Sequence, residues 1–430
     1  MDSFERAHVT TLLSRLREEP RRIIALSGPR QAGKTTIVRQ ALARLWKEDQ
    51  VRGLYYSADE PPPELGGWPN TATGRTVPSA TPGTPIGFPG EPLDARWIVR
   101  RWEAARAEAA RAGRAVLVLD EIQRVRQWST PVKGLWDRDR MEGSRLHVVV
   151  LGSAPLLMQS GLSESLVGRT EPLPVPHWSL GEMATAFGFG LDEYLFFGGY
   201  PGTADLIQDL SSWRRTVADF ITRTVERDVA SMSRVDRPAL LRNLFDAAAA
   251  YSAQPVTLRT LLGELDSREN AATVARYLEL LESAELIVGL RKHRGEPVIR
   301  RSPPKLVVLN TALMTAPATR TFDGARADRS YWGRIVESAV GAHLHQTRGP
   351  GIHLGYWRDD RREVDFVLRA EGRLLGIEVK SGRPRGGHVG LEAFRARFRG
   401  ARTLLVGEGG VPIHDFLSEP AAHWLEHDDR

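Results

Sequence analysis

Residues 27–36 read SGPRQAGKTT, and this motif indicates the fold of the first part of the chain. It fits the pattern G-x-x-x-x-G-K-[ST] and lies between an apolar segment, residues 23–26, and a segment of helical character, residues 35–46. The two glycines let the backbone curl so that successive N–H groups face phosphate oxygens. The start of the helix adds the positive end of its dipole, so a phosphate-binding loop is predicted here.

The expected ligand of this loop is ATP with Mg²⁺. Lys34 places a compact positive charge at the β- and γ-phosphates, and Thr35 offers its hydroxyl to Mg²⁺. The predicted nucleotide-binding residues are Gly28, Pro29, Arg30, Gln31, Ala32, Gly33, Lys34, Thr35 and Thr36.

A second motif follows the apolar run 116–119. Asp120 and Glu121 come directly after it, at the carboxyl end of a predicted parallel strand, where ligand sites of α/β proteins lie. Asp120 is expected to hold Mg²⁺ through water, and Glu121 is the candidate base for the attacking water. Ser153, after the next apolar run, is predicted to orient the attacking water or contact the γ-phosphate, like a sensor residue, and the alternative is an ST-turn or a helix N-cap. Arg169 is either an arginine finger across a subunit interface or a surface arginine.

Composition excludes several classes of protein. The chain of 430 residues has no cysteine, which rules out disulfide scaffolds, thiolate zinc sites and cysteine nucleophiles. No apolar run is long enough to span a bilayer, and the N-terminus lacks the apolar core of a signal peptide, so a cytoplasmic protein without membrane contact is predicted. The excess of 59 basic over 53 acidic residues weakly favours polyanionic partners.

The order of patterns along the chain predicts an α/β protein with several domains. Strand and helix patterns alternate in the first part, as in a parallel sheet covered on both faces. Residues 61–92 are rich in Pro, Gly, Thr and Ser and are interpreted as a flexible insertion. The predicted domains are a P-loop ATPase core at 1–180, a helical connector at 181–235, a winged helix at 236–325 and an α/β domain at 326–430.

The winged-helix prediction depends on three helical patterns, residues 239–250, 258–265 and 271–284, followed by two strands around a basic turn. We expect Thr273, Arg276 and Tyr277 on one face of the third helix, opposite an apolar stripe. Cations on a β-turn suit phosphate contacts with duplex DNA, although a solvated hairpin or a protein-binding surface is the alternative. The predicted DNA-binding residues are Thr273, Arg276, Arg291, Lys292, Arg294, Arg300 and Arg301.

Four residues of the last domain form a possible metal-dependent site. Glu337 lies on a predicted helix, Asp365 on a strand, and Glu378 and Lys380 on one face of the next strand. Carboxylate oxygens suit Mg²⁺ or Mn²⁺, and the lysine could orient water or stabilise a phosphate. The pattern resembles the PD-(D/E)XK nuclease core, helix–strand–strand–strand–helix–strand. Three interpretations stay open: metal-dependent cleavage, a retained fold that binds without cutting, and unrelated surface charges.

The ordered motifs resemble one prokaryotic family. The segments GPRQAGKTT, LDEIQRVRQW, LGSAPLLMQSGLSESLVGR and YLFFGGYPG are similar to those of AAA-type ATPases that carry a C-terminal DUF4143 domain related to PD-(D/E)XK nucleases. The resemblance covers nearly the whole chain and departs in the Pro/Gly-rich stretch after Tyr56. It implies ATP binding and an AAA+-like core followed by further domains.

Three hypotheses for function follow from these patterns. The first is an ATP-hydrolysing protein that forms a homo-oligomeric ring, a hexamer among the options, and acts on duplex or branched DNA as a motor or switch. The second is a STAND-like signalling switch whose C-terminal domain binds a protein partner. The third is an ATP-gated, Mg²⁺-dependent nuclease in defence.

Overall fold

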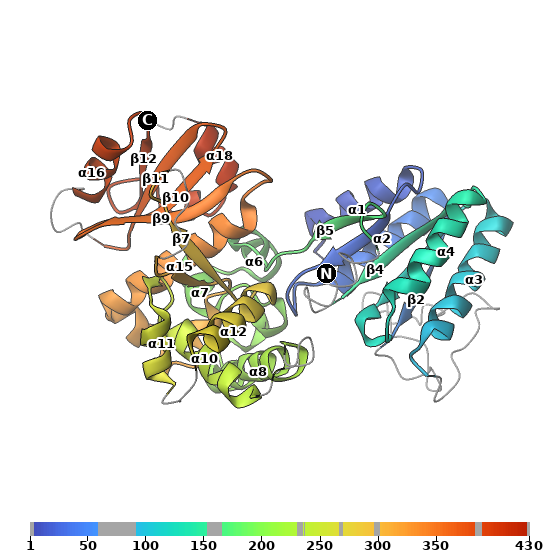
Figure 1. Ribbon diagram of the computed structural model, residues 1–430, viewed down its shortest axis with the longest axis horizontal. Helices are drawn as coiled ribbons and strands as arrows, with labels where there is room; N and C mark the ends of the chain where they lie inside the picture. Colours follow the sequence, from blue (N-terminus) through green and yellow to red (C-terminus); the bar gives the residue numbers. More distant parts are fainter. Residues whose placement is uncertain are drawn as a thin grey trace. The chain divides into compact units, whose positions relative to one another are not determined.

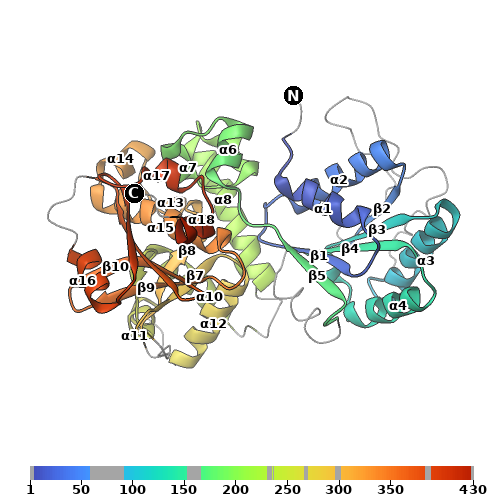
Figure 2. The ribbon, with the colours of Figure 1, turned by 90° about the horizontal axis from the view of Figure 1, so that it is seen from above.

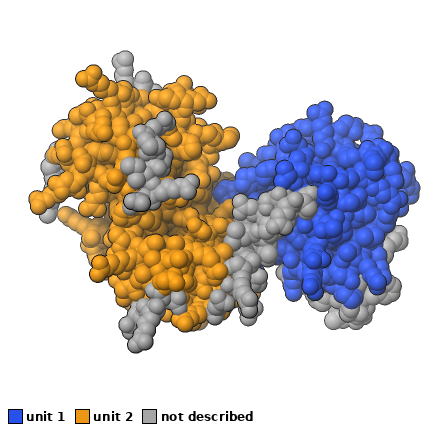
Figure 3. All heavy atoms as spheres, in the orientation of Figure 1, with its two compact units in different colours: residues 1–176 blue, residues 177–430 orange. Residues whose placement is uncertain are grey.

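The computed structural model describes residues 4–58, 92–152, 166–229, 235, 237–265, 270–295, 302–382 and 389–427. Within it the chain divides into two compact units, residues 1–176 and 177–430, which Figure 3 colours blue and orange. Residues 61–91 of the predicted insertion lie outside the described residues, and so does the candidate sensor Ser153.

The described residues of unit 1 form a five-stranded parallel sheet in the order β2-β3-β4-β1-β5. Its strands are β1 (Ile23–Ser27), β2 (Arg52–Ser57), β3 (Ala115–Asp120), β4 (Leu146–Leu151) and β5 (Thr170–Pro174). Its helices are α1 (Ala7–Arg17), α2 (Lys34–Asp49), α3 (Ala95–Ala112), η1 (Ile122–Arg124) and α4 (Ser129–Met141). The strands and helices predicted in this part are confirmed, and α4 and β5 are additions that the sequence patterns did not indicate.

Two layers of helices cover this sheet, α1 and α2 on one face and α3 and α4 on the other (Figure 2). Neighbouring residues of β1 alternate between the layers: Ile24 and Leu26 pack with α1 and α2, and Ile23 and Ala25 pack with α3 and α4. Because both faces are buried, the strands read as continuous apolar runs. This arrangement brings the carboxyl ends of β1 and β3 to one edge of the sheet.

Unit 2 begins with helices and ends with a large sheet (Figure 1). Its first helical elements are α6 (Leu180–Phe187), α7 (Leu191–Phe197), η2 (Pro201–Leu206), α8 (Leu210–Thr222) and the π-helical η3 (Arg223–Val229). Next come α10 (Pro238–Ala250), β6 (Gln254–Pro255), α11 (Leu258–Glu264), α12 (Ala271–Ser283), β7 (Ile287–Lys292) and β8 (Lys305–Val308). The three helical patterns predicted between residues 239 and 284 are therefore confirmed.

The last part of unit 2 follows the predicted order of elements. Two short helices, α13 (Ala312–Thr315) and α14 (Phe322–Ala327), lead into α15 (Arg329–Thr347), β9 (His353–Asp359), β10 (Arg362–Ala370) and β11 (Arg373–Lys380). These are followed by α16 (Val389–Arg397), β12 (Arg402–Gly407), α17 (Ile413–Phe416) and α18 (Ala421–Glu426). Helix, three strands, helix and strand thus occur in the expected sequence.

One sheet joins the middle and last parts of unit 2. In the described residues its seven strands run β12-β11-β10-β9-β7-β8-β6. The link is parallel pairing of β7 with β9, in which Arg291 lies opposite Gly355 and Lys292 opposite Tyr356. The structure therefore differs from the predicted division at residues 325/326, because the two strands expected to form a free wing belong to the larger sheet. None of the helices in the described ranges has the length and apolar character needed to cross a membrane.

Candidate functional site

The phosphate-binding loop between β1 and α2 has the backbone that the motif predicts. Gly33 has φ of 86°, a left-handed conformation that favours glycine, and α2 begins at the next residue. A Cβ added to Gly28 would collide with the carbonyl oxygen of Val175. The two glycines are therefore required by the turn and by close packing.

Lys34 is buried over the loop that precedes it. Its side chain donates hydrogen bonds of 2.8 Å to the carbonyl oxygens of Gly28 and Pro29, and the residue is only 8% exposed. These bonds hold the ammonium at the mouth of the loop, where the phosphates of a nucleotide would lie. The structure places Lys34 at the loop, and its contact with nucleotide phosphates stays a prediction.

Thr35 and Asp120 meet although 85 residues separate them. The Thr35 hydroxyl donates a 3.0 Å hydrogen bond to Oδ2 of Asp120. The Tyr55 hydroxyl, from the neighbouring strand β2, donates to the same oxygen. Hydroxyl and carboxylate oxygens are ligands that suit Mg²⁺, so these residues fit the ion that accompanies a nucleotide. The sequence analysis missed Tyr55, because only the pairing of β2 with β3 brings it to this edge.

Glu121 occupies a sharp turn directly after β3. Its φ is 51°, in the left-handed region, and its N–H donates a 2.8 Å hydrogen bond to Oδ1 of Asp120. The side chain of Gln123 donates a 2.5 Å hydrogen bond to Oε2 of Glu121. A left-handed backbone is uncommon for a residue other than glycine, so this turn is held by its surroundings.

Arg6 supports the loop from outside the motif. Its guanidinium donates hydrogen bonds to the carbonyl oxygens of Ala32, at 2.7 Å, and Pro176, at 3.1 Å. The residue is buried. Arg6 is therefore a positioning residue for the loop, and no local pattern in the sequence pointed to it.

Arg169 has a partner within its own unit. It forms a two-pronged ion pair with Asp137, with N–O distances of 2.6 and 2.9 Å. The hydrogen bond from Arg169 lowers the pKa of the Asp137 carboxyl. The ion pair gives Arg169 a structural role, and the arginine-finger role stays a prediction.

The four predicted residues of the last domain line one cavity of about 730 Å³ in unit 2. Glu337 comes from α15, Asp365 from β10, and Glu378 and Lys380 from β11. Lys380 forms a 2.6 Å ion pair with Glu378. Burial alone would lower the pKa of Lys380, but the hydrogen bond and charge of Glu378 outweigh it and raise that pKa.

A bulge in β10 aims Asp365 into the cavity. The register with β9 shifts between Val364 and Val367, so β10 has one extra residue there. Val364 and Phe366, on either side, are fully buried. Oδ2 of Asp365 accepts a 2.8 Å hydrogen bond from the N–H of Val379 on β11, which fixes the carboxylate.

Lys305 of β8 was given no site role in the sequence analysis, yet it lies at the centre of this cluster. Its ammonium forms ion pairs with Glu337, with Glu363 at 3.4 Å and with Asp365 at 3.4 Å. Burial would lower the pKa of Lys305, but the three carboxylates together raise it. Burial and the charge of Asp365 raise the pKa of Glu337.

The predicted metal set of Glu337, Asp365 and Glu378 does not fit a resident divalent ion as arranged. Across the described ranges, no three His, Asp or Glu side chains are grouped so that they could hold a metal ion. Glu337 and Asp365 share the Lys305 ammonium, and Glu378 pairs with Lys380. Oε1 of Glu337 and Oε2 of Glu378 are buried without a hydrogen-bond partner in the described part of the chain, but Oε1 of Glu337 is in ion-pair contact with Lys305, and a divalent ion needs several available oxygens.

The predicted DNA-binding residues of the middle segment differ in how exposed they are. Thr273 lies in the first turn of α12, Arg276 is exposed on it, and Arg291 and Arg294 are exposed at the end of β7. Lys292, in the pairing with β9, is partly buried. Tyr277 was expected beside Arg276 on the open face, and this was wrong: it is 1% exposed, because its ring packs into the core. Arg300 and Arg301 lie outside the described residues.

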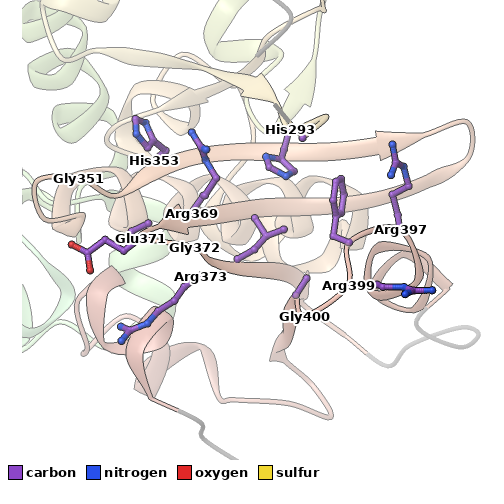
Figure 4. A pocket seen from close by; sticks show the side chains of 15 residues that line it. His293, Gly351, His353, Arg369, Glu371, Gly372, Arg373, Arg397, Arg399 and Gly400 are labelled. Carbon is purple, nitrogen blue, oxygen red and sulfur yellow. The ribbon is translucent and has the colours of Figure 1, made fainter. Parts of the chain in front are cut away.

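A basic cavity of about 640 Å³ lies at the other end of β10 and β11, around the turn that joins them (Figure 4). Its lining includes one carboxylate, Glu371, and the guanidinium groups of Arg369, Arg373, Arg397 and Arg399. His293 packs its ring on Phe398 at 4.9 Å. Burial and the nearby Arg369 lower the pKa of His293, so the positive charge of the cavity comes from the arginines.

Comparison with protein families matches three segments of the chain. Residues 93–184 match the model of an AAA domain, and residues 332–407 match the domain of unknown function DUF4143. These two segments of the chain are thus similar to an AAA domain and to DUF4143. The family resemblance is thereby confirmed, whereas the relation of DUF4143 to nucleases stays a prediction. Residues 189–322 match a further domain of unknown function, DUF8612.

Individual proteins that are similar to this chain give little information about its function. Uncharacterized proteins of Mycobacterium tuberculosis and Mycobacterium bovis are each 26% identical over 371 residues, covering 83% of this chain and 70% of theirs. The solved structure of AMPPCP-bound DnaA from Aquifex aeolicus aligns with a TM-score of 0.31 and 15% identity, over 64% of this chain and 85% of that one. A likeness of this size says nothing about what this chain binds.

Proposed function

We propose that this chain is an ATP-hydrolysing AAA-type protein that binds DNA and acts on duplex or branched DNA as a motor or switch. The hydrogen bond between Thr35 and Asp120 is the observation that carries the nucleotide part, since it joins the loop to the carboxylate after β3. A glycine turn without a binding role does not explain a contact between this loop and a carboxylate at the end of another strand.

Each residue of the site has a role in this proposal. The hydroxyl of Thr35 and the carboxylate of Asp120 would hold Mg²⁺, which when bound neutralises charge on the β- and γ-phosphate oxygens. Lys34 would direct its ammonium at the same oxygens. Glu121 would accept a proton from the attacking water while the hydrogen bond from Gln123 holds its carboxylate.

The DNA part of the proposal is supported by shape and charge in unit 2. The order α10, β6, α11, α12, β7, β8 and the antiparallel pairing of β8 with both β6 and β7 support the winged-helix prediction. Arg276 on α12 and the four arginines of the basic cavity would contact phosphates. The proposal includes a homo-oligomeric ring in which Arg169, with a side chain 32% exposed, would reach a neighbouring nucleotide.

The test of the whole proposal is ATP hydrolysis by the full chain with and without duplex, forked and four-way DNA. We expect DNA to raise turnover several-fold at low salt, and we expect this stimulation to decline steeply as salt increases. Hydrolysis that DNA leaves unchanged, together with no retention of DNA at low salt, would favour the signalling switch over a DNA-processing protein.

Replacing Glu121 with glutamine separates binding from chemistry. Glu121→Gln keeps an oxygen for Gln123 but loses the base, so turnover should fall by about 10²–10⁴-fold while ATP binding persists. Hydrolysis and calorimetric ATP binding measure the two effects. Glu142→Gln, at an exposed glutamate paired with Arg138, is the matched control and should behave as the parent chain. Full turnover in Glu121→Gln would place the base elsewhere.

A further inference from the structure

Lys305 is an unusual residue in this chain. It is one of only six lysines among 59 Lys and Arg residues, so arginine is the default cation. Its side chain is 0% exposed. A buried cation needs a specific set of partners, and an ammonium is a compact charge whereas a guanidinium is a planar fork. The site at Lys305 therefore selects a small, nearly spherical cation.

The surroundings of the Lys305 ammonium resemble the ligand set of a metal ion. Carboxylate oxygens of Glu337, Glu363 and Asp365 surround it, and the carbonyl oxygen of Asp365 lies at 3.2 Å. The ring of Phe366 covers another side, with its centroid 5.1 Å from Nζ. Oxygens from a helix and a strand thus converge on one positive centre.

We propose that the Lys305 ammonium takes the place of a divalent cation in this cavity, so the carboxylates of the DUF4143 domain are neutralised from within and bind neither Mg²⁺ nor Mn²⁺. A metal ion in this cavity would be repelled by the fixed ammonium of Lys305. It would also compete for the carboxylate oxygens that the ammonium already contacts. Lys380 holds Glu378 in the same way at the rim. This inference depends on neither ATP hydrolysis nor DNA binding.

The test is titration of the full chain with Mn²⁺ in the absence of nucleotide, with free Mn²⁺ followed by electron paramagnetic resonance. Mn²⁺ binding at this cavity is defined as the Mn²⁺ binding that is lost when Asp365 is replaced in Asp365→Asn. We expect no such binding in the parent chain. Lys305→Met keeps much of the aliphatic stem and removes the charge, and it should gain one Asp365-dependent site at least tenfold tighter than any in the parent. Lys133→Met, at an exposed lysine of unit 1, should gain none.

Each outcome decides the inference. Binding of Mn²⁺ to the parent chain that Asp365→Asn abolishes would overturn it at once, and this arm does not depend on how any Lys305 variant folds. A folded Lys305→Met, verified by circular dichroism, that gains no site would also overturn it, because something other than the ammonium would then exclude the metal. Gain in Lys305→Met with none in the parent supports it.

Discussion

Replacing Lys34 with alanine is expected to reduce ATP hydrolysis by about 10²–10³-fold, the usual effect of removing a preorganised charge from a developing anion. The ammonium of Lys34 is buried and fixed by the carbonyl oxygens of Gly28 and Pro29. No other lysine is placed to replace it in the described part of the loop. Hydrolysis and calorimetric binding of ATP with Mg²⁺ measure the loss.

The matched control for this prediction is Lys47→Ala. Lys47 lies in the last turn of the same helix, α2, and is exposed. Lys47→Ala also removes one positive charge from α2, but at the end of the helix that is remote from the loop. Hydrolysis should therefore be unchanged. Equal losses in both variants would indicate that net charge or the stability of α2, and not the ammonium at the phosphates, is responsible.

The residues of the proposed nucleotide site could be placed largely from the sequence because, within each of its two motifs, they are close together along the chain. The loop is a continuous motif, and Asp120 and Glu121 directly follow an apolar run. Parallel strands bring their carboxyl ends to one edge, so each part could be placed without knowing the strand order. Tyr55 and Arg6 could not be placed in this way, because their contacts arise from the pairing of β2 with β3 and from the packing of the N-terminal segment.

The C-terminal cavity was predicted only in part, and the missing part changes its chemistry. Glu337, Asp365, Glu378 and Lys380 do line one cavity, as their motif indicates. Lys305, however, belongs to a strand that the sequence assigned to another domain. It reaches the carboxylates only because β7 pairs with β9 and extends one sheet through both segments. Strand pairing between distant segments leaves no periodic signal in a single sequence.

Tyr277 illustrates the same limit on a smaller scale. Its position next to Arg276 on a helix allowed it to be assigned to the open face, since an aromatic residue with a hydroxyl suits either environment. The structure buries it beside Val274 and Leu281. The width of the apolar stripe on α12 depends on what packs against the helix, which helical periodicity alone does not determine.

Removal of the buried ammonium should also destabilise unit 2. Lys305→Met leaves three carboxylates facing one another without their shared counter-charge, and breaking a buried ion pair in this way costs about 3–5 kcal/mol of unfolding free energy. Chemical denaturation of the full chain, followed by tryptophan fluorescence, measures the shift. Lys133→Met, at an exposed site, should change the unfolding free energy by less than about 0.5 kcal/mol.

A second substitution distinguishes lost charge balance from lost packing. Above the pKa of Glu337, which burial and the charge of Asp365 raise to about 8, Glu337→Gln removes one of the three negative charges with little change in volume. It should destabilise the parent chain, since it takes a partner from Lys305, but it should restore part of the stability of Lys305→Met. Each single substitution should therefore lower the unfolding free energy, and the double variant should lose less than the sum of the two single losses. If the two losses simply add, the cluster is not electrostatically coupled, and the cost of Lys305→Met comes from packing.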